Sequence, residues 1–269
     1  QKVQKTTKPV SKTADPFDDP AVGGKFTIFV LMYGNFFEMH RRCINNILST
    51  VPENRRELRI GCNEVCPQTL DYLTQLQRDG HIQLMYNSRE NRKKYPMMRT
   101  MFHDSAHPIN TKWLLWFDDD SMADKDPGWA RKLAELIINI QETKNAMVGQ
   151  VKRWNIKGSQ ANWIKSRPWY KGRHFQIRNG QEAPNGQKIR FAEGGFWALR
   201  TDVMREAQVP DPEIGHNGGD YMVGEQVWQA GYDTKHWNQN KCFVTTSSVP
   251  RRGLHEKHTG TTGWKPGGV

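Results

Sequence analysis

A run of five apolar residues that ends in three carboxylates constrains the fold of this chain more than any other feature. Residues 113–117 read Trp-Leu-Leu-Trp-Phe, and Asp118, Asp119 and Asp120 follow directly. A short apolar run that contains three aromatic residues predicts a buried strand. Adjacent carboxylates repel one another, so three of them at a strand end indicate a bound cation such as Mg²⁺ or Mn²⁺. A solvated acidic turn is the alternative interpretation of the three aspartates.

The first half of the chain alternates between predicted strands and predicted helices. Strands are expected at residues 26–32, 58–62 and 82–86, and helices at residues 36–50, 67–79 and 97–104. This alternation predicts an α/β fold with a mostly parallel sheet. Such sheets bind ligands at the carboxyl ends of their strands, where Tyr33 and the three aspartates fall. The sequence therefore predicts a ligand site at that edge of the sheet.

Composition limits the class of protein only broadly. The chain has 269 residues and no apolar run long enough to span a bilayer, so we expect a soluble, cytoplasmic domain. Its four cysteines do not form two pairs suited to zinc and are expected to be reduced thiols. Residues 1–24 lack a periodic apolar pattern and predict a flexible or surface-wrapping arm. The chain starts at Gln1, which leaves open whether a signal or an anchor precedes it.

Two further motifs follow in the second half of the chain. Residues 191–199 read Phe-Ala-Glu-Gly-Gly-Phe-Trp-Ala-Leu, and the paired Gly194 and Gly195 would let a ligand approach the backbone closely. Residues 218–232 place Asp220 just before a predicted helix. Asp220 is either a functional carboxylate or a helix cap, because aspartate often caps helices. The order of these motifs after the acidic run is more specific than any one of them.

This order of motifs resembles that of the GT-A glycosyltransferases of the family-2 type, which carry a DXD motif, over residues 25–260. The resemblance implies one Rossmann-like GT-A domain, residues 25–269, with a basic insertion on the acceptor side. Its parts would be a nucleotide-sugar-binding half (25–124), an acceptor-binding half (125–258) and a C-terminal flap (259–269). The implied activity is transfer of a hexose from a nucleotide sugar, expected to be a UDP-hexose, to an acceptor hydroxyl.

The resemblance also implies roles for individual residues. The donor would be bound by Asp118, Asp119, Tyr33, Arg99, Gly194 and Gly195. Mn²⁺ or Mg²⁺ would be held by Asp120 and by a late histidine, His258. Asp220 would be the catalytic base, and it carries that role alone because Gly-Gly precedes it where many relatives have a Glu-Asp pair.

The segment of residues 151–190, called the basic segment below, carries most of the positive charge. The whole chain has a formal net charge of +11, and this segment holds ten Lys and Arg residues against one acid, Glu182. Cations interleaved with aromatic residues favour a polyanion whose bases or sugars stack on the rings. The expected acceptor contacts are Lys165, Arg167, Lys171, Arg173, Trp163 and Trp169. The alternative is a basic surface loop built around a local aromatic core.

A nucleic-acid acceptor would need a hydroxyl group on one of its bases. A hydroxymethylated pyrimidine in DNA supplies one, and the enzyme would flip that base out of the stack. Two other functions remain open from the sequence. One is a GT-A glycosyltransferase that acts on a protein, lipid or polysaccharide. The other is a non-catalytic or nucleotidyl-transfer protein with a similar fold and acidic motif.

Overall fold

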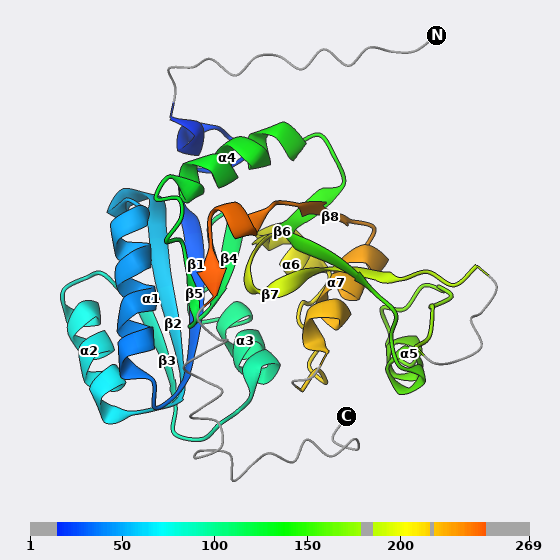
Figure 1. Cartoon of the computed structure of the whole chain (residues 1–269), viewed down its shortest axis with the longest axis horizontal. Helices are drawn as coiled ribbons and strands as arrows, with labels where there is room; N and C mark the ends of the chain where they lie inside the picture. Colours follow the sequence, from blue (N-terminus) through cyan, green and yellow to red (C-terminus); the bar gives the residue numbers. More distant parts are fainter. Residues whose placement is uncertain (1–14, 179–184, 216–217, 246–269) are drawn as a thin grey trace.

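The computed structural model describes residues 15–178, 185–215 and 218–245 (Figure 1). In these residues a seven-stranded sheet has the strand order β3-β2-β1-β4-β7-β6-β8. The strands are β1 (Phe26–Gly34), β2 (Arg56–Val65), β3 (Leu84–Ser88), β4 (Trp113–Asp118), β6 (Asn145–Trp154), β7 (Ile189–Arg200) and β8 (Asp233–His236). β7 runs antiparallel to both of its neighbours, and the other neighbouring pairs are parallel. The predicted α/β fold with a mostly parallel sheet is confirmed.

Helices cover both faces of this sheet (Figure 1). One face packs against α1 (Phe37–Thr50), α2 (Pro67–Arg78) and α4 (Trp129–Ile140). The other packs against α3 (Lys94–Phe102), α6 (Thr201–Glu206) and α7 (Gly219–Gln229). The short α5 (Gly158–Lys165) stands apart from the sheet, beyond the ends of β6 and β7. A second, two-stranded sheet joins β5 (Ser121–Met122) to β9 (Val244–Thr245).

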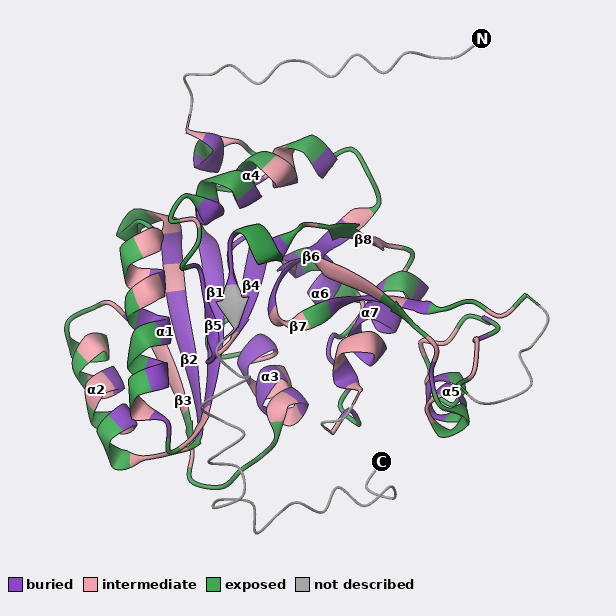
Figure 2. Ribbon diagram, in the orientation of Figure 1, coloured by how far each residue is buried: buried purple, intermediate pink, exposed green. Residues whose placement is uncertain are grey.

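The central strand β4 is buried on both faces, as its apolar run predicts (Figure 2). Leu115 and Phe117 point into the core below α1 and α4, whereas Leu114 and Trp116 point toward α3. The Trp116 ring stacks on Trp197 of β7, with 6.1 Å between ring centroids. Because both faces are packed, the strand is held rigidly, and the carboxylates that follow it have defined positions.

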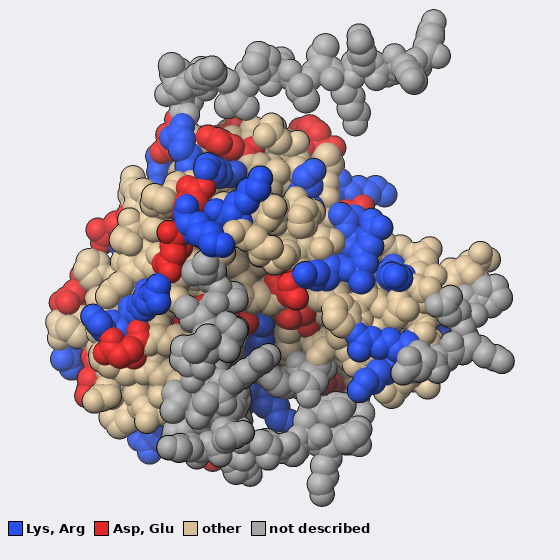
Figure 3. All heavy atoms as spheres, in the orientation of Figure 1, with Lys and Arg blue, Asp and Glu red and all other residues tan. Residues whose placement is uncertain are grey.

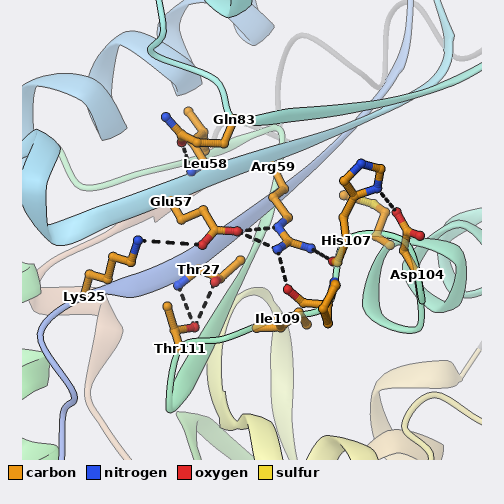
Figure 4. A network of polar contacts seen from close by, with 12 residues as sticks. Lys25, Thr27, Glu57, Leu58, Arg59, Gln83, Asp104, His107, Ile109 and Thr111 are labelled. Atoms are coloured by element: carbon orange, nitrogen blue, oxygen red, sulfur yellow. Dashed lines mark hydrogen bonds and ion pairs between the residues drawn. The ribbon is translucent and has the colours of Figure 1, made fainter.

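The amino-terminal ends of β1 and β2 are tied together by a polar network (Figure 4). Arg59 of β2 is 4% exposed, so its guanidinium needs partners inside the protein. It donates to Glu57 at 2.7 Å and to the carbonyl oxygens of His107 and Pro108 at 2.5 and 3.0 Å. This network fixes the loop before β4 at the sheet edge opposite the predicted ligand site.

The described part of the predicted N-terminal arm packs on the body of the protein. A 3-10 helix, η1 (Pro16–Asp18), places Phe17 against Phe26 with 5.3 Å between ring centroids, and Val22 is fully buried. The guanidinium of Arg55 lies 2.6 Å from an Asp15 carboxylate oxygen. Residues 15–24 therefore take the surface-wrapping form of the two that the sequence allows, and residues 1–14 lie outside the described residues.

Within the described ranges, none of the helices combines the length and apolarity that a bilayer span requires. The four cysteines, which all lie in these ranges, form no disulfide bonds in the structure.

Candidate active site

Two carboxylates from distant parts of the chain meet at the carboxyl end of β4. Asp118 is the last residue of β4, and Asp220 lies in the first turn of α7. The Lys94 ammonium, from the first turn of α3, lies 2.9 Å from Asp118 Oδ1 and 3.6 Å from Asp220 Oδ1. Two neighbouring carboxylates repel one another, so the shared cation stabilises the pair.

Two consecutive backbone amides of β7 hold the same carboxylates from the other side. The Gly194 N–H donates to Asp220 Oδ2 and the Gly195 N–H donates to Asp118 Oδ2, each at 3.1 Å. Gly195 has a φ of +67°, which favours glycine. A Cβ on Gly194 would lie 2.9 Å from Asp220 Oδ2 and 3.5 Å from Asp118 Oδ2. The Gly-Gly pair thus brings backbone donors close to both acids, and no room is left for a side chain at Gly194.

Asp220 is not the N-cap of α7, so the alternative role that the sequence allowed for it is not found in the structure. The N-cap of α7 is Gly218, and no side chain there accepts a hydrogen bond from the helix amides. The Asp220 carboxylate instead points away from α7, toward Gly194 and toward the Tyr95 hydroxyl, which donates to Oδ1 at 2.6 Å. Tyr95 itself is buried, and a Cβ on Gly219 would collide with its ring.

The ionisation of this cluster is set by burial and by the two acids. Burial by itself lowers the pKa of Lys94, but Asp118 and Asp220 outweigh it, and the net pKa is raised. Lys94 therefore remains a cation at any physiological pH. Burial, and next to it Asp220, raises the pKa of Tyr95 well above its usual value, so its hydroxyl remains a donor.

Replacing Gly194 by alanine is expected to lower the turnover of the site and to leave the fold intact. The new methyl group would push the Asp220 carboxylate out of place, and displacements of this size cost about 10- to 100-fold in rate. The measurement is kcat/KM of the Gly194→Ala protein together with its melting temperature. Gly158→Ala, where a Cβ meets nothing within 4 Å, is the matched control. Equal activity of the two variants would show that the Asp220 carboxylate does not need Gly194 to hold its position.

Asp119 has a different role from the other two acids of the motif. It is 2% exposed, and its Oδ2 lies 3.0 Å from His40 Nε2 and accepts the Tyr33 N–H at 3.1 Å. The other His40 ring nitrogen lies 3.0 Å from the Thr69 hydroxyl. Asp119 was predicted to bind the donor, but its carboxylate faces inward and ties the end of β1 to α1 and α2.

Asp120 lines a cavity of about 420 Å³ together with Asp118 and the Gly194–Gly195 backbone. The neighbouring Ser121 hydroxyl is buried and has no hydrogen-bond partner among the described residues. Within those residues no group of three or more His, Cys, Asp or Glu side chains could hold a metal ion. Mg²⁺ and Mn²⁺ are commonly held by one or two carboxylates plus phosphate oxygens and water, so Asp120 and Ser121 fit such an ion as a partial set. His258, the other predicted ligand, lies outside the described residues, as does the predicted flap.

A second cavity, of about 230 Å³, lies at the carboxyl ends of β1 and β2. Tyr33, which the resemblance assigns to donor binding, lines it together with Asn35, Phe36 and Glu64. Glu64 has a φ of +60°, which is uncommon for a residue with a side chain and often marks a functional position. This residue was not predicted from the sequence, where only its place after a strand pointed to it.

Arg99 lies away from the acidic cluster. Its guanidinium donates to the carbonyl oxygens of Gln208 and Pro210 at 2.9 and 2.6 Å, and it lines a separate cavity with Trp169. The prediction that Arg99 contacts the donor is therefore not supported by its position. The cation beside the acids is Lys94, in the first turn of α3, which nothing in the sequence distinguishes from the other Lys and Arg residues of positions 89–99.

The predicted acceptor residues separate into buried and exposed groups. Trp163 is 8% exposed and packs edge-on against Trp169, whose indole N–H donates to Asp211 at 2.7 Å. Trp163 belongs to the hydrophobic core on the α3 and α7 face of the sheet, and the half-buried Trp169 packs against that core. Arg167 covers Trp163 and pairs with Glu213. Of the six predicted contacts, Lys165 and Lys171 are the two that are exposed.

Arg173 is buried and has a structural partner, so it was wrongly predicted as an acceptor contact. Its guanidinium lies 2.5 Å from Glu225, which is fully buried in α7, and 4.1 Å from the centroid of the Trp228 ring. Burial raises the pKa of Glu225 to about 7, against the opposing effect of Arg173. Gln229 also donates to Glu225, at 2.8 Å. The pair ties the basic segment to the helix that carries Asp220.

Removing one member of this pair is expected to destabilise the protein strongly. Arg173→Met would leave the Glu225 carboxylate buried without its cation, which costs about 3–5 kcal/mol. The free energy of unfolding in urea measures this loss. The exposed Arg178→Gln is the matched control and should change stability by less than about 0.5 kcal/mol. The double variant Arg173→Met/Glu225→Leu should recover most of the loss, and failure to recover would contradict an uncompensated charge as its cause.

Comparisons with solved structures show which type of fold this chain has. No protein-family model and no curated protein matches the sequence. Among solved structures, the chain is similar to the mannosyltransferase PcManGT from Pyrobaculum calidifontis in complex with GDP-Man and Mn²⁺, at a TM-score of 0.58 and 16% identity. It is also similar to GalNAc-T7 with UDP, GalNAc and Mn²⁺ (0.55, 10%) and to S. aureus TarS (0.52, 13%).

These similarities extend over most of this chain and less of the others. They cover 93%, 81% and 86% of this chain, but only 63%, 43% and 38% of PcManGT, GalNAc-T7 and TarS, respectively. At such low identity the likeness concerns the fold. The fold is of the GT-A type, and the acidic cluster lies at the carboxyl ends of its parallel strands.

Proposed function

We propose that this protein is a metal-dependent glycosyltransferase that moves a sugar from a nucleotide sugar to an acceptor hydroxyl. One observation carries the proposal. In a GT-A-type fold, Asp118 and Asp220 meet over Lys94 and two β7 amides, beside a cavity lined by Asp120. Such an arrangement suits a donor that brings a diphosphate and an acceptor that must lose a proton. The three similar structures, two of them in complexes with Mn²⁺, support the same class of activity.

The two cavities suggest how a donor would lie. The smaller one, lined by Tyr33 and Glu64, offers an aromatic ring and a carboxylate for a nucleobase. The larger one offers Asp118 for the nucleoside side and Asp120 for the diphosphate side. We propose a sugar nucleotide as donor, and a hexose as the sugar that is transferred.

In the reaction, the acceptor oxygen forms a bond to the anomeric carbon while the bond from that carbon to the diphosphate breaks. Asp220, held by the Gly194 amide and the Tyr95 hydroxyl, takes the proton from the acceptor hydroxyl. Lys94 adds positive charge beside the leaving diphosphate. A divalent cation held by Asp120 and Ser121 would supply further charge stabilisation of that leaving group.

A donor screen tests this proposal. The purified protein is incubated with UDP-, GDP- and dTDP-hexoses in Mn²⁺ or in EDTA, and release of the nucleoside diphosphate is measured. We expect slow hydrolysis of at least one donor in Mn²⁺ and none in EDTA. Tight binding of a sugar nucleotide without turnover by any acceptor would favour a binding protein with the same fold. Release of pyrophosphate from a nucleoside triphosphate would favour nucleotidyl transfer.

For the acceptor we propose a hydroxymethylated pyrimidine in DNA, flipped into the cavity. The charge of the basic segment supports this choice, whereas the positions of Trp163 and Trp169 do not, because Trp163 is buried and Trp169 packs edge-on against it. A protein, lipid or polysaccharide acceptor keeps every catalytic assignment made above. Transfer of labelled sugar to hydroxymethylated DNA, with unmodified DNA as the control, separates the two.

A further inference from the structure

The basic segment exposes more positive charge than the protein itself neutralises. Four of its ten cations have acidic partners: Lys152 with Glu193, Arg167 with Glu213, Arg173 with Glu225 and Arg190 with Asp233. The other six are exposed and have no carboxylate partner among the described residues: Arg153, Lys157, Lys165, Lys171, Arg178 and Lys188. Cations gathered without acids repel one another, and a bound polyanion would relieve that repulsion.

An exposed aromatic ring lies next to one of these cations, Arg178. Trp154, the last residue of β6, is 44% exposed, the largest value for a big apolar side chain in the described part of the chain. The Arg178 guanidinium lies 4.5 Å from the centroid of its ring. The Arg178 N–H donates to the Ile156 carbonyl at 2.8 Å, which holds this residue next to the end of β6. An exposed indole beside a guanidinium is a suitable platform for a nucleobase.

This surface is continuous with the candidate active site. Gln150 and Glu193 line the cavity that contains Asp118 and Asp120. Lys152 follows Gln150 on β6 and lies 3.3 Å from Glu193, and Trp154 comes two residues later. Gln150 at the cavity rim and Trp154 are four residue steps apart along β6, a distance of about 13 Å. Figure 3 shows Lys and Arg side chains gathered on this side of the molecule, next to a smaller group of acids.

We propose that this surface binds the backbone of a nucleic acid, with Arg153, Arg178 and Lys188 on its phosphates and a base stacked on Trp154. The proposal rests on the proposed function in one respect, that the bound polymer carries the acceptor hydroxyl. A nucleic acid is favoured because it joins a dense row of anions to aromatic faces, and both features have a counterpart here. These proposed nucleic-acid contacts differ from the acceptor contacts that the sequence predicts, because Trp163 and Arg173 are buried and Arg167 has an acidic partner.

Binding of fluorescent DNA at several salt concentrations tests the surface. The probes are a duplex and a single-stranded oligonucleotide, both unmodified, with the full-length protein and no donor. We expect Kd to rise steeply with salt. The triple variant Arg153→Gln/Arg178→Gln/Lys188→Gln should lower the slope of log Kd against log salt by about 2 to 3. Trp154→Ala should weaken single-strand binding by about 5-fold or more and leave the slope unchanged.

A charge-matched variant separates this surface from general attraction between a basic protein and DNA. Arg78→Gln/Arg131→Gln/Lys144→Gln removes the same charge from exposed positions on α2, on α4 and before β6. It should leave the slope as it is. Equal effects of the two triple variants, or no DNA binding by the unmodified protein, would overturn the proposal. Binding of a sulfated glycan in preference to both oligonucleotides would overturn it in favour of an acidic polysaccharide.

The outcome is independent of whether the catalytic proposal holds. Donor hydrolysis is measured without DNA, so its absence counts against the glycosyltransferase alone. DNA binding is measured without donor, so its absence counts against this surface alone. Sugar transfer to hydroxymethylated DNA that is lost in the Arg153→Gln/Arg178→Gln/Lys188→Gln variant, and retained in the charge-matched variant, would support both proposals together.

Discussion

Replacing Asp220 by asparagine is expected to lower kcat for sugar transfer by about 10²- to 10⁴-fold and to leave donor affinity nearly unchanged. The amide keeps the shape of the carboxylate. Its oxygen can accept from the Gly194 N–H, and its NH2 group, which replaces the other carboxylate oxygen, can donate to the Tyr95 hydroxyl oxygen. It cannot take a proton from the acceptor. Steady-state kinetics with the donor and acceptor varied separately, on protein whose melting temperature has been measured, give the result.

Glu193→Gln is the matched control for this prediction. Glu193 also lines the cavity, but it is half exposed and pairs with Lys152 rather than with the acidic cluster. We expect it to retain most of the activity. A large loss in Glu193→Gln with normal turnover in Asp220→Asn would transfer the base role to Glu193. A loss of stability without a loss of turnover per folded molecule would make Asp220 a structural residue.

Replacing Asp120 by alanine is expected to abolish sugar transfer and the Mn²⁺ dependence of donor binding. The variant loses the carboxylate expected to hold the metal against the leaving diphosphate, and with it the charge stabilisation of that group. Its fold should persist, because the core on both sides of β4 is unaffected. Calorimetric titration of the nucleoside diphosphate in Mn²⁺ and in EDTA measures the effect.

The adjacent Asp119 provides the contrast within the same motif. Asp119→Ala removes a buried acceptor from both His40 and the Tyr33 N–H, so it should lower the melting temperature. Metal dependence should survive in the molecules that remain folded. Near-normal transfer by Asp120→Ala in Mn²⁺ buffer would contradict the metal assignment, and identical behaviour of the two variants would remove the distinction between the two acids.

The sequence by itself determined the parallel part of the sheet and the edge at which the candidate site lies. The apolar runs of β1 and β4 predict strands that are buried on both faces. Pro67 indicates the start of α2, because proline has no backbone N–H and the N–H groups of a helix's first turn have no partner within the helix. These are local effects of residue type and spacing. They also located the acidic motif at the end of β4 and the Gly-Gly pair on a strand, both of which the structure contains.

Only the tertiary structure decided which side chains contact the aspartates at that edge of the sheet. Lys94 and Arg99 are five positions apart on α3, so they point about 140° away from one another, and only the docking of α3 selects which one meets Asp118. Asp119 is distinguished from its neighbours by His40, 79 residues earlier in the chain.

The same holds for the basic segment. In the sequence, Trp163 and Trp169 are typical of a stacking surface, but in the structure their rings pack against each other. Arg173 forms an ion pair with Glu225 of α7, which lies 52 residues later in the chain. Burial and ion pairing between remote residues depend on three-dimensional packing, whereas hydrophobic periodicity depends only on neighbours along the chain. For this reason the sequence determined which edge of the sheet bears the site, and the packing of α3, α7 and the basic segment decided which side chains face it.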